Sequence, residues 1–212
     1  MPRKIFEPDP YAPYFITGRC INRDWFALEM EDVWSIFEDH LYMLHHGFDV
    51  RIHSFLLMSN HFHMIASAPN SNLSIGMAYF MREISRWLTL ESGRINQCWG
   101  QRFHRSRIGT ERQFLNVYKY VYQNPLRAGI CQRVEDYRFS TLSVLLGRRQ
   151  SSITLQPDDW LFSGNIEDNL EWLNQQPESD DLESIRRALR RREFKLPNTR
   201  GPKLNSLEYR AF

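Results

Sequence analysis

Two β-rich runs lie only two residues apart in the first third of the chain. Residues 48–58 and 61–68 are rich in apolar, β-branched and aromatic side chains, and only Ser59 and Asn60 separate them. A connection this short joins antiparallel strands, because a parallel crossover needs a dozen or more residues. The sequence therefore predicts a β-hairpin at this place.

Strand and helix patterns alternate on both sides of the hairpin. The predicted elements run strand, helix, strand, strand, helix, strand, helix. They cover residues 12–22, 31–46, 48–58, 61–68, 73–90, 101–109 and 111–124. Gly47 and Gly93 stand where the first two helices should end, and Pro125 should break the last one. This order predicts an α+β fold, an antiparallel sheet with helices packed on one face.

The last part of the chain differs in composition from the rest. Residues 148–212 are first acidic and then basic, and prolines interrupt them. One or two helices fit this part, of which 181–193 has the clearest pattern. We therefore expect one domain over residues 1–147 and a charged C-terminal extension over 148–212.

Length and composition exclude several classes of protein. The 212 residues are 42% hydrophobic and 14% aromatic, which is enough to bury a core. No apolar run approaches the roughly 20 residues that span a bilayer, and the N-terminus lacks an apolar signal-peptide core. The three cysteines form no CxxC pair, which argues against a structural zinc site or a disulfide framework. We expect a soluble, cytoplasmic protein.

Charge is spread unevenly along the chain. Residues 82–133 carry ten Arg or Lys against three Glu, a local net charge of +7, whereas 157–183 carry nine acidic residues and no Arg or Lys. A basic block of this kind favours a polyanion partner such as nucleic acid. An ordinary solvated surface is the alternative that charge alone leaves open.

His61 and His63 begin the second strand of the predicted hairpin. Residues i and i+2 of a strand point to the same face, so both imidazoles should project from one side while Phe62 faces the core. Two such rings can chelate one divalent ion. Because the chain has seven histidines and such pairs arise by chance, the residues alone leave metal binding open.

The last predicted helix carries tyrosines at three alternate positions. Helical geometry puts Tyr118 and Tyr122 on one face, which we assign to packing. Tyr120 shares a mostly polar face with Asn116 and Asn124. A phenol there could attack a phosphate polarised by a metal ion, and Asn124 could offer that ion an amide oxygen. An exposed tyrosine and a helix-capping asparagine are the alternative.

Several segments together resemble a known family. They are LLMSNHFHMIA (56–66), CWGQRFHRSRI (98–108), YVYQNPLRAGI (120–130) and VEDYRFST (134–141). In order and spacing they resemble the IS200-like tyrosine transposases, and in particular their REP-associated branch. The resemblance covers about residues 13–146. It implies a ferredoxin-like fold, in agreement with the predicted order of strands.

The resemblance also implies a site and an activity. It assigns His61 and His63 to the HUH motif that holds Mg²⁺ or Mn²⁺, Tyr120 to the nucleophile, and Asn124 to a polar third ligand. It implies DNA transposition by an endonuclease that cleaves and rejoins single-stranded DNA near palindromic hairpins through a 5′-phosphotyrosine intermediate. Tyr122 stands where many members have His, and it could support a metal ligand from behind or be a competing nucleophile. Ser59 stands where many have Pro, a change we expect to alter only the turn.

Arginines supply the candidate DNA contacts. They are Arg102, Arg105, Arg107, Arg127, Arg186 and Arg190. The expected partner is single-stranded DNA with hairpin-forming repeats, bound by a monomer or a dimer. Two alternatives stay open: a domesticated module that binds hairpins without cutting them, and an unrelated metal hydrolase that uses the two histidines.

Overall fold

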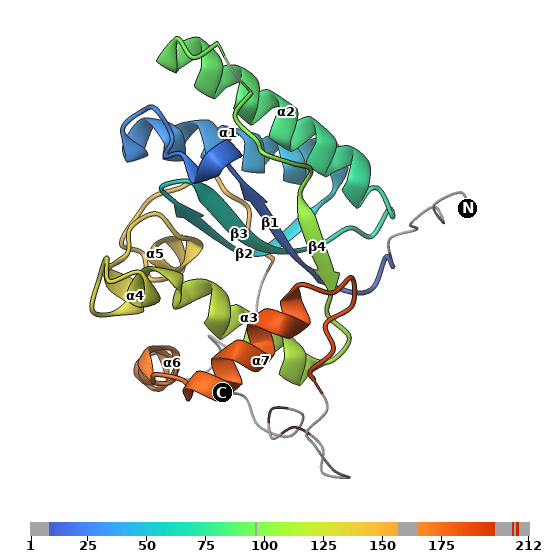
Figure 1. The fold of residues 1–212 in the computed structure, drawn as a ribbon, viewed down its shortest axis with the longest axis vertical. Coiled ribbons are helices and arrows are strands. Elements are labelled where there is room, and N and C mark those ends of the chain that lie inside the picture. Colours follow the sequence, from blue (N-terminus) through green and yellow to red (C-terminus); the bar gives the residue numbers. More distant parts are fainter. Residues whose placement is uncertain (1–8, 96, 157–164, 198–204, 206, 208–212) are drawn as a thin grey trace.

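The computed structural model describes residues 9–95, 97–156, 165–197, 205 and 207. At its centre is a four-stranded antiparallel sheet in the order β2-β3-β1-β4 (Figure 1). The strands are β1 (Tyr14–Arg19), β2 (Arg51–Met58), β3 (His61–Ser67) and β4 (His104–Arg107). Met58 pairs with His61 across the Ser59–Asn60 turn, so the predicted hairpin is confirmed.

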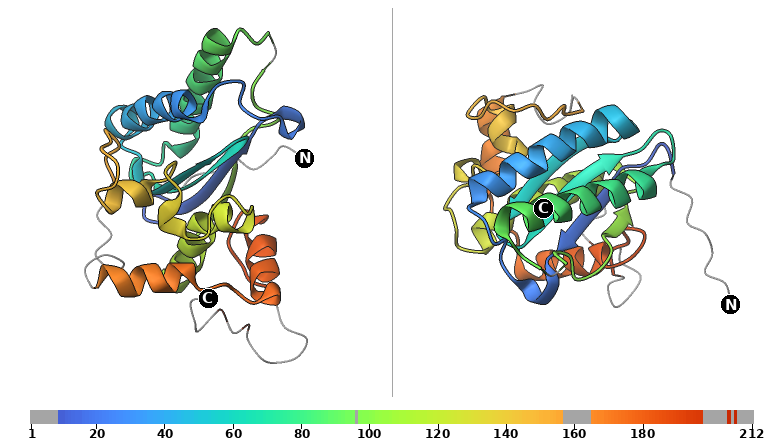
Figure 2. Two further views of the ribbon diagram at one scale, coloured as in Figure 1. Left: turned by 90° about the vertical axis from the view of Figure 1, so that its left-hand side faces the viewer. Right: turned by 90° about the horizontal axis from the view of Figure 1, so that it is seen from above.

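Two long helices cover one face of this sheet. They are α1 (Met30–Phe48) and α2 (Leu73–Ser92), which lie side by side across the strands (Figure 2). The β1-α1-β2-β3-α2-β4 order is the ferredoxin-like arrangement. The core beneath the helices is rich in buried aromatic rings, among them Trp34, Phe37, Phe55, Phe62 and Phe80. The predicted α+β fold class is therefore confirmed. Among the described helices, none is both long and apolar enough to cross a membrane.

A second layer of helices covers the opposite face, where we expected none (Figure 1). It comprises α3 (Glu111–Tyr122), α4 (Asn124–Arg127), α5 (Thr141–Leu145), α6 (Ile166–Asn174) and α7 (Ser179–Leu189). Two short 3-10 turns, η1 (Ile21–Arg23) and η2 (Val134–Asp136), complete the described elements. The physical reason is that this face is apolar as well. Phe15, Leu56 and Ile65 project from it and are buried in a second core against α3.

The C-terminal extension contributes to this second core. Leu173, Ile185, Leu189 and Phe194 are buried in it. The chain after α7 also extends the sheet, because Arg107 N–H donates to the carbonyl of Arg192 and Phe194 N–H donates to that of Arg107, both at 2.8 Å. Residues on both sides of the predicted boundary at 147 thus share one core. The two-domain division stays a prediction, and part of the acidic stretch, 157–164, lies outside the described residues.

The helix ends follow the sequence signals with one exception. Gly93 ends α2 in the left-handed region, with φ of 68°, as expected. Gly47 does not end α1. The helix continues to Phe48, and Asp49 takes the left-handed conformation with φ of 51°, which a short polar side chain tolerates. Pro125 ends the α3 pattern and falls in the first turn of α4, where its missing N–H costs nothing.

Candidate active site

The sheet holds His61 and His63 on the face that α3 covers. β3 is an inner strand, and across it His63 pairs with Thr17 and His61 with Arg19. Phe62 points the opposite way, into the core under α1 and α2. The ring centroids of the two histidines are 4.8 Å apart. The predicted same-face arrangement of the pair is therefore what the strand produces.

Burial keeps both imidazoles neutral. Desolvation, with the positive charge of Arg19, lowers the pKa of His61 to about 3. The pKa of His63 also lies well below its usual value, because the ring is buried near His61, Arg127 and Arg19. At neutral pH each ring therefore has a nitrogen lone pair, which is the form that binds metals.

The two rings differ in their hydrogen bonds. His61 Nδ1 lies 2.6 Å from Asn60 Oδ1, so the neutral ring donates its N–H there and keeps the lone pair on Nε2. His63 Nδ1 is buried and has no hydrogen-bond partner among the described residues. A buried polar atom without a partner is costly. A bound cation at this place would remove that cost.

Tyr120 projects from α3 toward the histidines. The helix starts at Thr110, whose hydroxyl accepts the backbone N–H of Gln113 at 3.2 Å and caps the first turn. The centroid of the Tyr120 ring lies 6.1 Å from that of His63. Phe15 of β1 contacts both rings, with centroids 5.5 Å from His63 and 6.2 Å from Tyr120. A partly exposed phenol and a predicted metal ligand thus share one aromatic neighbour.

The other two tyrosines pack in the core, as predicted. Tyr118 and Tyr122 are buried, and the Tyr122 hydroxyl lies 2.8 Å from Thr141 Oγ1. The structure therefore does not bring Tyr122 to the histidines. Asn116, expected on the polar face with Tyr120, is also fully buried and donates its amide to the carbonyl of Leu207.

Asn124 closes the site from the end of α3. Its Nδ2 donates to the carbonyls of Tyr120 at 2.9 Å and Val121 at 3.1 Å, which leaves Oδ1 as the amide atom available to a ligand. A hydrogen bond between the Asn124 side chain and His63 works against burial by raising the pKa of that ring. Asn124 therefore lies beside His63, and its role as a metal ligand stays a prediction.

Arg127 lies directly over the Tyr120 ring. Its guanidinium carbon is 4.4 Å from the ring centroid, and Nη2 donates to the Tyr120 carbonyl at 2.9 Å. Burial lowers the pKa of Arg127 to about 10, so the group is still charged at neutral pH. Its Nε and Nη1 are buried and have no partner among the described residues. Arg127 is therefore a buried positive charge beside the Tyr120 ring.

A cavity of about 490 Å³ lies beside His63 and Tyr120. His63, Tyr120 and Phe15 line it together with four arginines. The arginines are Arg19, Arg102, Arg186 and Arg190. Arg186 lies in α7 and Arg190 directly follows it, so the C-terminal extension supplies positive charge to the same cavity as the tyrosine. Such a set of cations suits an anionic ligand that carries several phosphates.

Comparison with known proteins bears on this arrangement. No family model matches the chain. A putative REP-associated tyrosine transposase of Haemophilus influenzae is 24% identical over 115 residues, which are 49% of this chain and 62% of that protein. The REP-associated tyrosine transposase of Escherichia coli is 26% identical over 117 residues, which are 55% of this chain and 65% of that protein. About half of this chain is homologous to the REP-associated tyrosine transposases. The chain spans less than two thirds of the length of either relative.

A solved structure supports the same fold. It is that of a REP-associated tyrosine transposase bound to a REP hairpin, and the likeness covers 74% of this chain and 93% of that one. The TM-score is 0.57 at 20% sequence identity, so this likeness establishes the fold. The transposase homology and the shared fold agree with the arrangement of strands that carries His61 and His63.

Two of the arginines predicted to bind DNA in this transposase homologue lie away from the tyrosine. Arg105 and Arg107 pair across the sheet with Ile16 and Tyr14, which face α1 and α2. Arg107 forms ion pairs with Asp9 at 3.0 Å and Glu193 at 3.6 Å. Arg105 donates to Ser74 Oγ at 3.2 Å. The structure thus brings Arg102, Arg127, Arg186 and Arg190 to the site but leaves this pair on the other face.

Arg19 and Asn60 are site residues that the sequence analysis missed. Arg19 lies across from His61, and Asn60 orients the His61 ring. Asn60 could have been found from its place next to the HxH pair. Arg19 could not, because its contact depends on the register between β1 and β3, which are more than 40 residues apart.

The described residues offer a metal ion two nitrogens and an amide oxygen. Among them, no group of three or more His, Cys, Asp or Glu is placed to hold a metal. Asn124, which hydrogen-bonds to His63, is the other side chain that could serve as a third ligand. The neutral rings and the unpartnered Nδ1 of His63 fit a divalent cation here.

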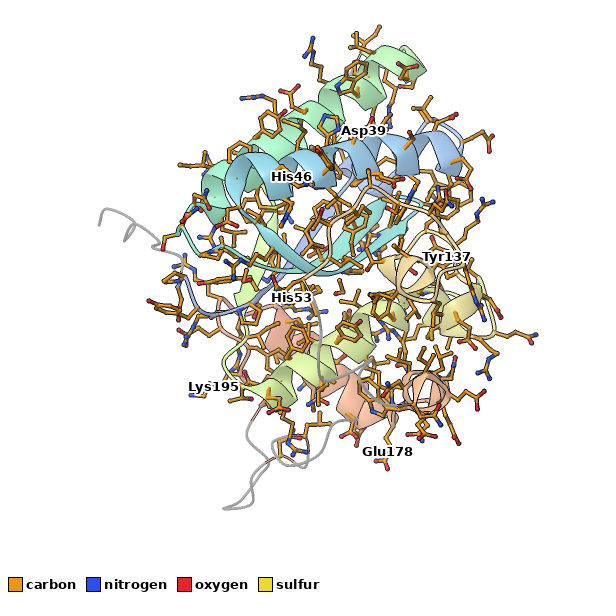
Figure 3. All side chains as sticks on the ribbon, turned by 180° about the vertical axis from the view of Figure 1, so that it is seen from behind. Asp39, His46, His53, Tyr137, Glu178 and Lys195 are labelled. Atoms are coloured by element: carbon orange, nitrogen blue, oxygen red, sulfur yellow. The ribbon has the colours of Figure 1, made fainter. Side chains whose placement is uncertain are left out.

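Buried histidines give the protein a predictable dependence on pH. His53 contacts Ser67 Oγ and the ring of Phe114, and burial lowers its pKa to about 4 (Figure 3). In the unfolded chain histidine titrates near 6.5, so below that pH the unfolded state binds protons that the folded state does not. We expect the free energy of unfolding, measured with urea in EDTA, to fall by about 2 kcal/mol per buried histidine between pH 7 and pH 5.

Two single substitutions isolate this effect. His53→Gln removes the buried titrating group, so the loss of stability between the two pH values should shrink by about 2 kcal/mol. His46→Gln, on the exposed side of α1 (Figure 3), should leave the pH dependence as it is in the wild type. Equal pH dependence of the wild type and His53→Gln would contradict the assignment.

Proposed function

We propose that this chain is a metal-dependent endonuclease and strand transferase that cuts and rejoins single-stranded DNA with Tyr120 as its nucleophile. The observation that carries the proposal is the position of the Tyr120 ring, 6.1 Å from His63 within a cavity lined by arginines. Homology to REP-associated tyrosine transposases over about half of the chain supports it.

The proposed chemistry is a transesterification. The Tyr120 oxygen attacks the phosphorus, the bond from phosphorus to the 3′ oxygen breaks, and that oxygen takes up the proton lost by the phenol. The 5′ phosphate is then linked to tyrosine. This link conserves the energy of the broken bond, so a 3′ hydroxyl can reverse the step without ATP. Arg102, Arg127, Arg186 and Arg190 would neutralise the phosphate oxygens.

His61, His63 and Asn124 would hold the metal ion, Mg²⁺ or Mn²⁺. A bound cation supplies polarisation of the scissile phosphate, which lowers the demand on a weak phenol nucleophile. The support is the neutral state of both imidazoles and the unpartnered Nδ1 of His63. On affinity grounds imidazole nitrogens favour Mn²⁺ over Mg²⁺.

The proposed DNA partner contains a hairpin. The solved structure of similar fold is that of a transposase bound to a REP hairpin. We infer that this chain likewise binds single-stranded DNA with hairpin-forming palindromic repeats and acts on the unpaired strand beside them. DNA as the substrate agrees with the cytoplasmic location expected from the sequence.

A cleavage assay tests the proposal. The full chain is incubated with an end-labelled DNA hairpin that has unpaired flanks, either with Mn²⁺ or with EDTA, and the products are separated on a denaturing gel. We expect a shortened strand only with Mn²⁺, and none from a duplex of the same sequence. A hairpin that binds tightly but is uncut with either Mn²⁺ or Mg²⁺ would instead identify a binding module without nuclease activity.

A further inference from the structure

A large groove lies beyond the Tyr120 cavity, between α2 and residues 97–105. Its volume is about 1350 Å³, whereas small-molecule pockets are typically about 300–1,000 Å³. Its lining residues run along α2 from Ser74 to Leu90 and along the chain from Gln97 to Arg105, so the groove follows the helix. This size and shape fit an extended ligand better than a compact one.

The walls of the groove are positively charged. Five arginines line it, and none of its described lining residues is acidic. The arginines are Arg82, Arg86, Arg102, Arg105 and Arg192. Glu83, which is not a lining residue, forms ion pairs with Arg82 at 2.8 Å and Arg86 at 3.4 Å. One carboxylate does not balance five guanidinium groups, so the groove keeps a net positive charge that suits a polyanion.

Aromatic and apolar side chains also line the groove. Trp99 Nε1 donates to the carbonyl of Met81 at 2.7 Å, which fixes the orientation of the indole. Phe103 is partly exposed beside it, and the Arg105 guanidinium lies 5.6 Å from its ring centroid. Rings next to arginines are the combination that binds unpaired bases, by stacking and by phosphate contacts. A duplex cannot use such rings, because its bases stack on one another.

The groove is continuous with the Tyr120 cavity. Gln101, Arg102 and His104 line both spaces. These residues lie just before β4 and at its first position, whereas residues 192–194 pair with β4 at Arg107, its last position. A strand with one phosphate at Tyr120 therefore has a path past the start of β4 into the groove.

We propose that the groove binds the unpaired stretch of the DNA strand that Tyr120 cuts. The proposal rests on the proposed function, since it states where the strand that flanks the cut lies. Bases would stack on Trp99 and Phe103, while Arg82, Arg86 and Arg192 contact phosphates. Recognition of this kind tolerates many sequences, because every base has a face that can stack.

Binding without cleavage tests the groove. The affinity of the full chain for a fluorescent DNA hairpin is measured in EDTA, with and without a short oligothymidine tail at the 5′ or the 3′ end. We expect one of the tails to increase affinity about tenfold or more. The same tail annealed to its complement should give no such gain.

Substitutions assign the gain to the groove. Phe103→Leu keeps an apolar side chain but removes the ring, and Arg86→Ala removes an exposed charge, so each should lose most of the gain from the tail. Arg86→Ala should also reduce the salt dependence of tail binding by about one phosphate contact. Arg51→Ala is the matched control, because Arg51 is exposed on β2, at the opposite edge of the sheet, and should keep the full gain.

The outcomes separate this proposal from the nuclease itself. The groove proposal is wrong if neither tail increases affinity, or if the increase in affinity remains in both Phe103→Leu and Arg86→Ala. Cleavage with Mn²⁺ is measured on the same preparations. If the protein cleaves DNA but the tail gives no gain in affinity, the groove proposal fails and the nuclease proposal stands. If the gain depends on Phe103 but no cleavage occurs, the groove proposal stands and the nuclease proposal fails. Arg86→Ala alters only an exposed side chain, so it decides the question if Phe103→Leu does not fold.

Discussion

Tyr120→Phe is expected to abolish DNA cleavage while the affinity for the hairpin changes by no more than about twofold. The substitution removes one oxygen atom and keeps the ring that contacts Phe15 and Arg127. Without the phenol oxygen no covalent intermediate can form, and loss of a nucleophile typically lowers the rate by a thousandfold or more. Cleavage is measured under single-turnover conditions with Mn²⁺, and binding by fluorescence anisotropy in EDTA.

Tyr122→Phe is the matched control. Tyr122 is buried, and its hydroxyl contacts Thr141 rather than the cavity. Loss of that hydrogen bond should cost about 1 kcal/mol of stability and leave the cleavage rate unchanged. The assignment of the nucleophile is wrong if Tyr120→Phe still cleaves the hairpin and Tyr122→Phe does not.

His63→Ala should eliminate metal binding and, with it, cleavage. Wild-type protein in the absence of DNA is expected to unfold at a higher temperature when Mn²⁺ is added, because the ion binds only the folded state. His63→Ala removes the buried imidazole that we propose as a metal ligand, between His61 and Tyr120. We expect its affinity for Mn²⁺, measured by calorimetric titration, to fall at least about a hundredfold.

His53→Gln shows whether this loss is specific. His53 is a partly buried histidine, also on the α3 side of the sheet, but it contacts Ser67 and Phe114 rather than His61. Its substitution should leave the affinity for Mn²⁺ unchanged. A His63→Ala protein that binds Mn²⁺ as tightly as the wild type would show that the histidine pair is not the metal site.

Local patterns were sufficient to predict the hairpin and the direction of its side chains. The two-residue turn at Ser59 and Asn60 fixes the pairing, and alternation then places His61 and His63 on the face opposite Phe62. In the same way helical geometry separated Tyr120 from Tyr118 and Tyr122. These predictions succeeded because each depends on residues close together in the sequence.

Contacts between distant segments were not predictable in this way. The positions of Arg186 and Arg190 in the cavity follow from the packing of α7 on α3, which joins residues some 70 positions apart. The arginines of β4 were visible in the sequence, but the alternation of its side chains did not show which face of the strand would meet Tyr120. The register between β4 and β1 decides which face this is, and it places Arg105 and Arg107 on the face away from Tyr120. Pairing energies of this kind depend on the whole fold.

The second helical layer was missed for a related reason. Phe15, Leu56 and Ile65 make one face of the hairpin and β1 apolar, while their neighbours make the other face apolar as well. A strand buried on both faces is a nearly continuous apolar run in the sequence. Such a run shows that the strand is buried, but it does not show which elements cover it. Charged residues and prolines led us to interpret residues 148–212 as an extension. The apolar side chains that α6 and α7 bury were therefore not recognised as part of a core.

The covalent intermediate tests the central claim most directly. The full chain is incubated with Mn²⁺ and a DNA hairpin with unpaired flanks, then digested with nuclease and trypsin, and modified peptides are identified by mass spectrometry. Trypsin releases residues 120–127, YVYQNPLR, and fragmentation of this peptide distinguishes its two tyrosines. We expect a nucleotide linked through its 5′ phosphate to Tyr120. A nucleotide on Tyr122, or a cleaved hairpin with no modified tyrosine, would contradict the proposed mechanism.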